Sequence, residues 1–290
     1  MKDISIRAIA FDATIRAFGV TTSKVLERAI LEQGLNPYAA VALGRGLSSA
    51  AMLSEMDKGT GIKTTFQVRG DGPMGGVVVV SDGKSILKGY VLNNDYTDYG
   101  DNKSIGSLVG KGFLSIIKDM GSGQPYTGVI PLATGEIGED LALYFTRSEQ
   151  IPTLVALGVA LHPDMTVDIS AGLILQAMPG AKDQVIKLLE NRMGDIQSFS
   201  HFAQTTGDPA RMLEHVLGKE NMSVLAVKET EYRCDCSEQR MKRGLLALGR
   251  KELLSMTGKK ELVEVSCHFC NRKYSYHPEE LKKCIEGFCD

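Results

Sequence analysis

The stretch Tyr232-Arg-Cys-Asp-Cys-Ser237, followed by Val265-Ser-Cys-His-Phe-Cys-Asn-Arg-Lys-Tyr274, decides how the end of this chain folds. It holds a C-x-C pair, Cys234 and Cys236, and a C-x-x-C pair, Cys267 and Cys270. Two close cysteine pairs about 30 residues apart are typical of a tetrahedral metal site, and four unrelated buried cysteines would not share that spacing. We therefore predict one Zn²⁺ per chain, bound by these four thiolates, in a module that needs the metal to fold.

The spacing of the first pair is unusual, because both halves of a zinc ribbon are commonly C-x-x-C. A disulfide within C-x-C would close a small ring with unfavourable geometry and would be easily reduced. In a reducing cytosol, paired cysteines are more often metal ligands or redox devices than permanent crosslinks. The pair therefore suits a reversible switch.

Four neighbouring side chains leave alternatives open. His268 lies inside the C-x-x-C pair and His277 follows it, so either could join a mixed site, although four thiols make this unnecessary. Cys284 and Cys289 are either spare thiols or partners in oxidation. The first 233 residues contain no cysteine, so all thiol chemistry falls at the end of the chain.

Composition and charge exclude several classes of protein. The 290 residues are 43% hydrophobic and 23% charged, as in globular proteins, and the net charge of -2 gives no reason to bind nucleic acid. The start MKDISIRAIAFD is too charged for a signal peptide, and no apolar run could span a membrane. We expect a cytoplasmic protein that binds neither nucleic acid nor membrane.

The glycine-rich segment 70–75 matches G-x-G-x-x-G, but Pro73 interrupts it and a valine-rich strand follows. A dinucleotide site needs a helix there, so this segment predicts a hairpin and no nucleotide. Neither G-x-S-x-G nor H-E-x-x-H occurs. We expect no enzyme.

Apolar periodicity predicts an α+β body. Over 182–217 the sequence pattern changes to that of short helices, whose apolar face must pack against another part of the protein. In the cysteine module we predict two helices, two strands and a final helix from Pro278. The strands expected in the body are 4–10, 14–20, 64–69, 77–80, 85–92, 112–118, 126–132, 154–162 and 166–176, with helices from 23 to Gly34, over 38–58 and over 136–146.

Over nearly its whole length the chain resembles the heat shock protein 33 family, whose members are redox-regulated holdase chaperones. The cysteine blocks carry most of the resemblance. Further matching blocks are Ile6-Arg7-Ala8, Ala42-Leu43-Gly44-Arg45, Gly70-Asp71-Gly72-Pro73, Val109-Gly110-Lys111-Gly112, Tyr126-Thr127-Gly128, Ser148-Glu149-Gln150-Ile151-Pro152 and Met178-Pro179-Gly180.

This resemblance implies an α+β fold: an amino-terminal mixed α/β-sheet domain over 1–180, a helical linker over 181–230 and a small zinc-binding domain over 231–290. It implies that the reduced, zinc-bound form is inactive. Oxidation would form disulfides between Cys234 and Cys236 and between Cys267 and Cys270, with zinc release and unfolding of the linker.

The oxidised protein would form a homodimer and hold unfolded client proteins without ATP, under oxidative stress. The expected client-binding residues are those of the apolar linker face: Leu188, Leu189, Phe199, Phe202 and Leu213.

Two alternatives use the same cysteines. A zinc-dependent thiol-disulfide oxidoreductase would exchange disulfides with substrates, although no thioredoxin-like β-α-β pattern surrounds either pair. A zinc-ribbon adaptor would bind its partner in the reduced, metal-bound form, with salt-dependent binding if that partner is nucleic acid.

Overall fold

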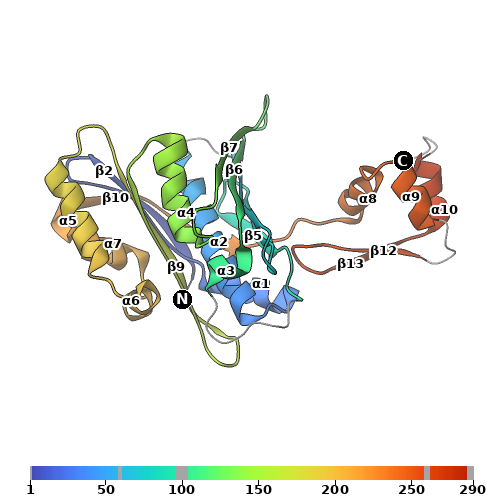
Figure 1. The fold of residues 1–290 in the computed structure, drawn as a ribbon, viewed down its shortest axis with the longest axis horizontal. Coiled ribbons are helices and arrows are strands. Elements are labelled where there is room, and N and C mark those ends of the chain that lie inside the picture. The colour runs from blue at the N-terminus through green and yellow to red at the C-terminus, as the bar shows by residue number, and fades with distance from the viewer. Residues whose placement is uncertain (1, 58–60, 96–103, 258–261, 286–290) are drawn as a thin grey trace. The chain divides into compact units, whose positions relative to one another are not determined.

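The computed structural model describes residues 2–57, 61–95, 104–257 and 262–285 (Figure 1). The chain forms two compact units, Met1–Arg233 and Cys234–Asp290. Among the described residues, no helix is both long enough and apolar enough to cross a bilayer.

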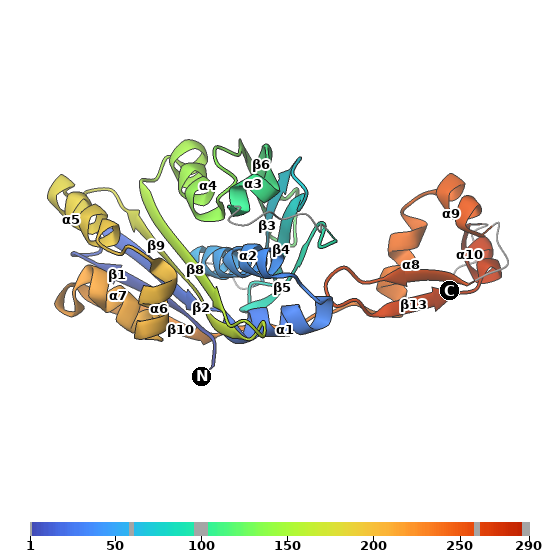
Figure 2. The ribbon, with the colours of Figure 1, turned by 60° about the horizontal axis from the view of Figure 1, so that its bottom comes forward.

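Helix α2 (Pro37–Met56) lies between two sheets of the first unit (Figure 2). The side chain of Asn36 begins it by accepting a hydrogen bond from the Ala39 N–H at 2.9 Å. Many residues of α2 are small, so both sheets can approach it closely, and most of its residues are buried. The main core therefore surrounds this helix, with side chains from both sheets and from α1 (Ser23–Gln33).

The first sheet is antiparallel, with the strand order β10-β1-β2-β9-β8. A turn at Asp12-Ala13 joins the strands predicted over 4–10 and 14–20, and Phe11, Asp12 and Ala13 all have positive φ values, of 51, 56 and 62°. A hairpin at His162 joins the strands predicted over 154–162 and 166–176, with the His162 N–H donating to the Thr166 carbonyl at 2.9 Å. The strands are β1 (Ile4–Ala10), β2 (Ile15–Thr21), β8 (Thr153–Leu161), β9 (Val167–Ala177) and β10 (Met222–Glu229).

The second sheet has the order β11-β5-β4-β3-β6-β7. Its glycine-rich segment 70–75 joins two antiparallel strands, which confirms the predicted hairpin. The strands are β3 (Lys63–Gly70), β4 (Gly76–Ser81), β5 (Ile86–Val91), β6 (Gly112–Asp119), β7 (Tyr126–Pro131) and β11 (Glu231–Tyr232). Two short helical segments in this half were not predicted: α3 (Ile105–Val109) and the π-helix η1 (Phe145–Glu149).

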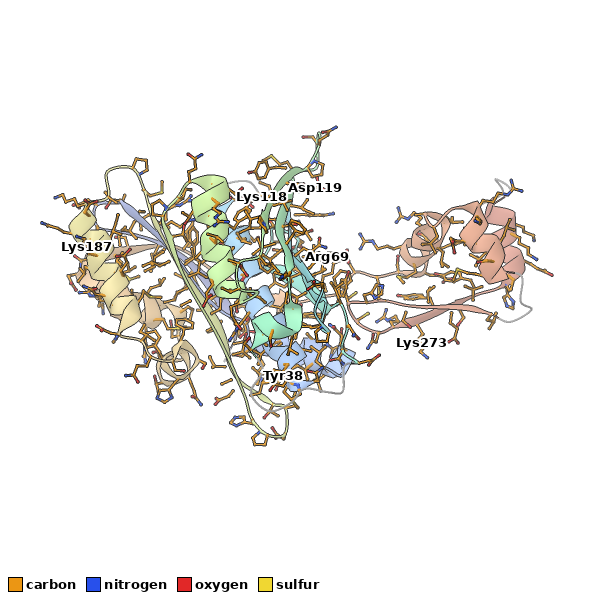
Figure 3. All side chains as sticks on the ribbon, in the orientation of Figure 1. Tyr38, Arg69, Lys118, Asp119, Lys187 and Lys273 are labelled. Atoms are coloured by element: carbon orange, nitrogen blue, oxygen red, sulfur yellow. The ribbon has the colours of Figure 1, made fainter. Side chains whose placement is uncertain are left out.

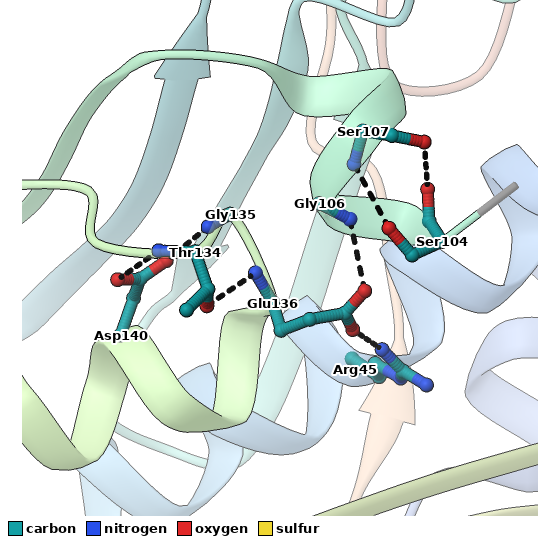
Figure 4. Close-up of polar contacts among 8 residues, drawn as sticks. All are labelled: Arg45, Ser104, Gly106, Ser107, Thr134, Gly135, Glu136 and Asp140. Carbon is teal, nitrogen blue, oxygen red and sulfur yellow. Dashed lines mark hydrogen bonds and ion pairs between the residues drawn. The ribbon is translucent and has the colours of Figure 1, made fainter.

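Polar contacts tie three helices together near the middle of α2 (Figure 4). Glu136, which precedes α4 (Ile137–Tyr144), accepts a hydrogen bond from the Gly106 N–H of α3 at 2.9 Å and forms an ion pair with Arg45 of α2. The buried carboxylate of Asp140 accepts one from the Gly135 N–H at 2.7 Å. These contacts fix α3 and α4 against the core helix.

Three further helices cover the outer face of the first sheet: α5 (Asp183–Gly194), α6 (Phe199–Thr206) and α7 (Pro209–Leu217). Their apolar side chains join those of β1, β2 and β9 in a second core. The predicted apolar face of this segment therefore packs on the sheet.

Strand β10 was not predicted, and the expectation of helix throughout 181–230 is wrong for its last part. It pairs with β1, from Ile4 opposite Glu229 to Ala10 opposite Met222. Most of its side chains are exposed, including Leu225 and Val227. The alternation of buried and exposed residues that identifies a strand in sequence is therefore missing, because β10 lies at the sheet edge.

The second unit is a hairpin with three helices around a small core. The core consists of Leu245, Leu253, Val263, Tyr276 and Leu281. Along the second strand, exposed and less exposed residues alternate, so Lys273 faces solvent and Tyr276 is fully buried (Figure 3). The predicted elements are confirmed: α8 (Glu238–Leu246), α9 (Arg250–Thr257), β12 (Val263–Ser266), β13 (Lys273–Tyr276) and α10 (Pro278–Ile285).

Candidate metal centre

The four predicted cysteines meet in one cluster, with all their Sγ atoms within 4.8 Å of one another. The Sγ atoms of Cys234 and Cys267 are 3.6 Å apart, and those of Cys236 and Cys270 are 3.5 Å apart. A tetrahedral zinc site with Zn–S bonds of about 2.3 Å has sulfurs about 3.8 Å apart. The cluster therefore has the donors and the size of a zinc-thiolate site.

The C-x-C pair lies between β11 and α8, in an extended segment held by the start of that helix. Ser237 caps α8 by accepting from the Arg240 N–H at 3.3 Å. The Arg240 guanidinium forms an ion pair with Asp235 and donates to its backbone carbonyl at 3.1 Å. The residue between the two cysteines is thus anchored to the helix that follows them.

The C-x-x-C pair lies in the turn between β12 and β13. The Cys267 N–H donates to the Arg272 carbonyl at 3.0 Å, and the Cys267 carbonyl accepts from the Asn271 N–H at 2.8 Å. Asn271 adopts a left-handed conformation with φ 53°, which asparagine tolerates better than most residues. This tight turn points both sulfurs to one side.

The surroundings of the cluster oppose the charged form of two of its sulfurs. Burial raises the pKa of the Cys234 thiol far above its usual value and raises the pKa of the Cys270 thiol to about 11. Burial also acts on Cys236, but hydrogen bonds from Tyr274 and the neighbouring sulfurs outweigh it and lower the pKa of that thiol. A bound divalent cation would deprotonate all four.

Sequence reasoning missed one side chain at this centre. The Tyr274 hydroxyl donates to the Cys236 sulfur at 3.1 Å. The only available signal was its place on a short strand after the second cysteine pair, which does not reveal a contact with the first pair.

The two histidines considered as ligands are not in the cluster. Both His268 and His277 are exposed, and the metal-ligating group found among the described residues consists of cysteines. Cys289 lies outside the described residues, as does the side chain of Cys284.

The five expected client-binding residues belong to the helices over the first sheet. Leu189 and Leu213 are buried there, and Phe199 and Phe202 pack half-buried with their ring centroids 5.9 Å apart. Leu188 remains 37% exposed. The structure thus places four of the five in the second core.

Comparison with known proteins agrees with this architecture. The family model described as Hsp33 protein matches residues 3–277. The 33 kDa chaperonin of Acetivibrio thermocellus is 38% identical over 293 residues, covering 99% of this chain and 98% of the relative. That of Ruminiclostridium cellulolyticum is 38% identical over 290 residues, with 99% of both chains covered.

A solved structure is similar over the whole length. The crystal structure of the 33 kDa chaperonin of Thermotoga maritima, a heat shock protein 33 homolog, superposes with a TM-score of 0.87 at 31% identity. The match covers 99% of this chain and 98% of that one. The chain therefore belongs to the Hsp33 family.

Proposed function

We propose that this protein is an ATP-independent holdase chaperone of the cytoplasm, not an enzyme, and that oxidation of its four clustered cysteines switches it on. The observation that carries the proposal is the gathering of Cys234, Cys236, Cys267 and Cys270 into one cluster, in a unit distinct from a body without cysteine. Membership of a family whose relatives are named chaperonins supports the client-holding role.

In the reduced state the four thiolates would bind one Zn²⁺. The bound ion supplies folding free energy, about 10–16 kcal/mol for structural sites in small peptides. The protein itself contributes a small core of five buried side chains, the turn at Asn271 and the ion pair of Asp235 with Arg240. That core is too small to keep the unit folded alone.

Oxidation would remove the ligands in pairs. Each pair of thiolates gives two electrons to the oxidant and forms one S–S bond, so it can no longer hold a cation. We propose the pairs Cys234 with Cys236 and Cys267 with Cys270, on the family resemblance. In a tetrahedral cluster all sulfurs are nearly equidistant, so the distances between them do not favour one disulfide pairing. Nearness in the sequence would instead select the partner of each cysteine.

Unfolding of the second unit would reach the helices over the first sheet through the segment that connects them. Cys234 lies two residues after the end of β11, which itself follows β10. Release of α5–α7 would expose the side chains that we propose to bind unfolded clients, namely Leu188, Leu189, Phe199, Phe202 and Leu213, and the sheet face beneath them. The same apolar surface would support a homodimer of the oxidised form.

An oxidant titration tests the proposal. Zinc release, free thiols and the suppression of aggregation of a denatured test enzyme are measured on the same samples of full-length protein, with peptide mapping of the disulfides. We expect the three signals to change together, with Cys284→Ser and Cys289→Ser variants behaving as wild type.

Zinc release without suppression of aggregation would refute the chaperone role. Catalytic disulfide exchange by the zinc-free protein would indicate an oxidoreductase. Disulfides linking the first pair to the second would overturn the proposed pairing.

A further inference from the structure

Tyr274 and Tyr276 lie two positions apart on β13, and their hydroxyls have different partners. That of Tyr274 donates to the Cys236 sulfur at 3.1 Å, and that of Tyr276 donates to the backbone carbonyl of Glu238 at 2.8 Å. The first contact reaches the cysteine cluster, and the second holds the strand to α8. One unit thus offers two tyrosine hydroxyls, of which one touches a sulfur.

A second contact of the Tyr274 hydroxyl, with Arg272, explains why this hydroxyl donates its proton to Cys236. The Arg272 side chain also contacts the Tyr274 hydroxyl. A guanidinium has only donors, so it must donate to the phenol oxygen. The phenol proton is then left for the Cys236 sulfur.

The other sulfurs are protected differently. Those of Cys234 and Cys270 accept hydrogen bonds from backbone N–H groups, of Cys236 and Arg272 respectively. Cys267 is 3% exposed, so its sulfur is shielded by burial. Cys236 is partly exposed, and outside the cluster its sulfur has a side-chain donor, Tyr274, so a single substitution can remove that hydrogen bond without altering the backbone.

We propose that Tyr274 is a positioning residue that slows the oxidation of Cys236 through its hydrogen bond to the sulfur, and thereby sets the oxidant threshold of the switch. The inference rests on the proposed function only in treating oxidation of the cluster as the trigger. A donated hydrogen bond withdraws electron density from a thiolate and stabilises it, so the sulfur becomes a weaker nucleophile.

The affected step is the first attack on a peroxide. A lone pair of the Cys236 sulfur forms the S–O bond, the O–O bond breaks, and its electron pair leaves with the departing hydroxide, which gives a sulfenic acid. A second thiolate then attacks this sulfur, the S–S bond forms, and the S–O bond breaks with loss of another hydroxide. Two thiolates and one peroxide thus give one disulfide and two hydroxides. The Tyr274 hydrogen bond must weaken in the first transition state, because negative charge leaves the sulfur.

The test compares Tyr274→Phe with Tyr276→Phe in the reduced, zinc-loaded, full-length protein. Zinc release is followed with a colorimetric indicator, once under excess hydrogen peroxide and once under a chelator without oxidant. We expect peroxide to release zinc about three- to tenfold faster from Tyr274→Phe than from wild type. Release from Tyr276→Phe under peroxide, and from Tyr274→Phe under the chelator, should stay near wild type.

A spectroscopic readout separates the effect on sulfur from a loss of structure. In protein loaded with Co²⁺, the sulfur-to-metal charge-transfer band is expected to move to lower energy in Tyr274→Phe and to stay in place in Tyr276→Phe. Equal acceleration of peroxide-driven and chelator-driven release would overturn the inference and leave Tyr274 a merely structural residue. So would equal peroxide rates in the two variants.

A second comparison keeps every tyrosine in place and so does not depend on the folding of a variant. Protein labelled throughout with 3-fluorotyrosine, whose phenol is a stronger donor, should release zinc more slowly under peroxide than unlabelled protein. Labelling that leaves the rate unchanged or raises it would contradict the inference. Client holding is not measured in these experiments, so the failure of holdase activity would refute the proposed function and leave this inference standing.

Discussion

Gly44 lies in the middle of α2, where the absence of a side chain lets neighbours approach the helix backbone. A Cβ atom there would lie 2.7 Å from Cδ2 of Leu26 and 2.8 Å from Cγ2 of Val159, closer than packed carbon atoms tolerate. Gly194, the last residue of α5, has nothing within 4 Å of the same position. The two glycines thus serve different purposes in similar local structure.

Replacing each glycine by alanine should change stability in opposite directions. We expect Gly44→Ala to lower the free energy of unfolding of the first unit by about 1–3 kcal/mol, because overpacking outweighs the gain in helix propensity. Gly194→Ala should raise it by up to about 1 kcal/mol, because there only propensity and chain entropy change. Urea unfolding of the reduced, zinc-loaded protein measures both, and a more stable Gly44→Ala variant would contradict this account.

Helix α5 contacts the first sheet along one face only. Leu189 is 2% exposed in the second core, while its neighbour Leu188 is 37% exposed. Successive residues of a helix point about 100° apart, so adjacent leucines can lie on opposite sides of the buried boundary. Attachment of the helix therefore depends on few side chains.

Truncating these two leucines tests that attachment. Leu189→Ala is expected to cost about 2–4 kcal/mol, through lost burial and a cavity, and to increase amide exchange in α5. Leu188→Ala should cost less than about 1 kcal/mol, because its side chain is partly exposed and lies outside the second core, so its truncation leaves no closed cavity. Urea unfolding and hydrogen exchange followed by mass spectrometry check both; similar costs would mean that α5 does not pack as described.

The elements that sequence reasoning predicted are those with a strong local signal. Strands with alternating burial, such as β3, and helices with a clear cap, such as α2 after Asn36, were correct. Strand β10 was missed because an edge strand with exposed side chains lacks that alternation. The cysteine cluster followed from spacing alone, whereas Tyr274 did not, since its contact joins segments 38 residues apart.

At the scale of the whole molecule, the chain consists of two units with very different cores. The first contains two extensive clusters of buried apolar residues around its sheets. Among its described residues, the second has a core cluster of five buried apolar side chains and the cysteine cluster. Their dependence on a metal should differ accordingly.

Removing the metal under reducing conditions should therefore unfold one unit and not the other. With a strong chelator and a thiol reductant, we expect residues 234–290 to lose amide protection because about 10 kcal/mol or more of metal-binding free energy is withdrawn. The sheets of the first unit should keep their protection, because no ligand comes from them. Hydrogen exchange resolved by peptide measures both, and loss of protection in both sheets would contradict two independent units.

The pairing of β10 with β1 has a consequence for biosynthesis. Ile4 is made before its partner Glu229, which follows more than two hundred residues later in the chain. During translation β1 can pair with β2 at one edge, while its other edge stays unpaired until β10 has been made. The strand that closes this edge ends five residues before Cys234, with only the short β11 between them, so the body is completed just before the first metal ligand emerges.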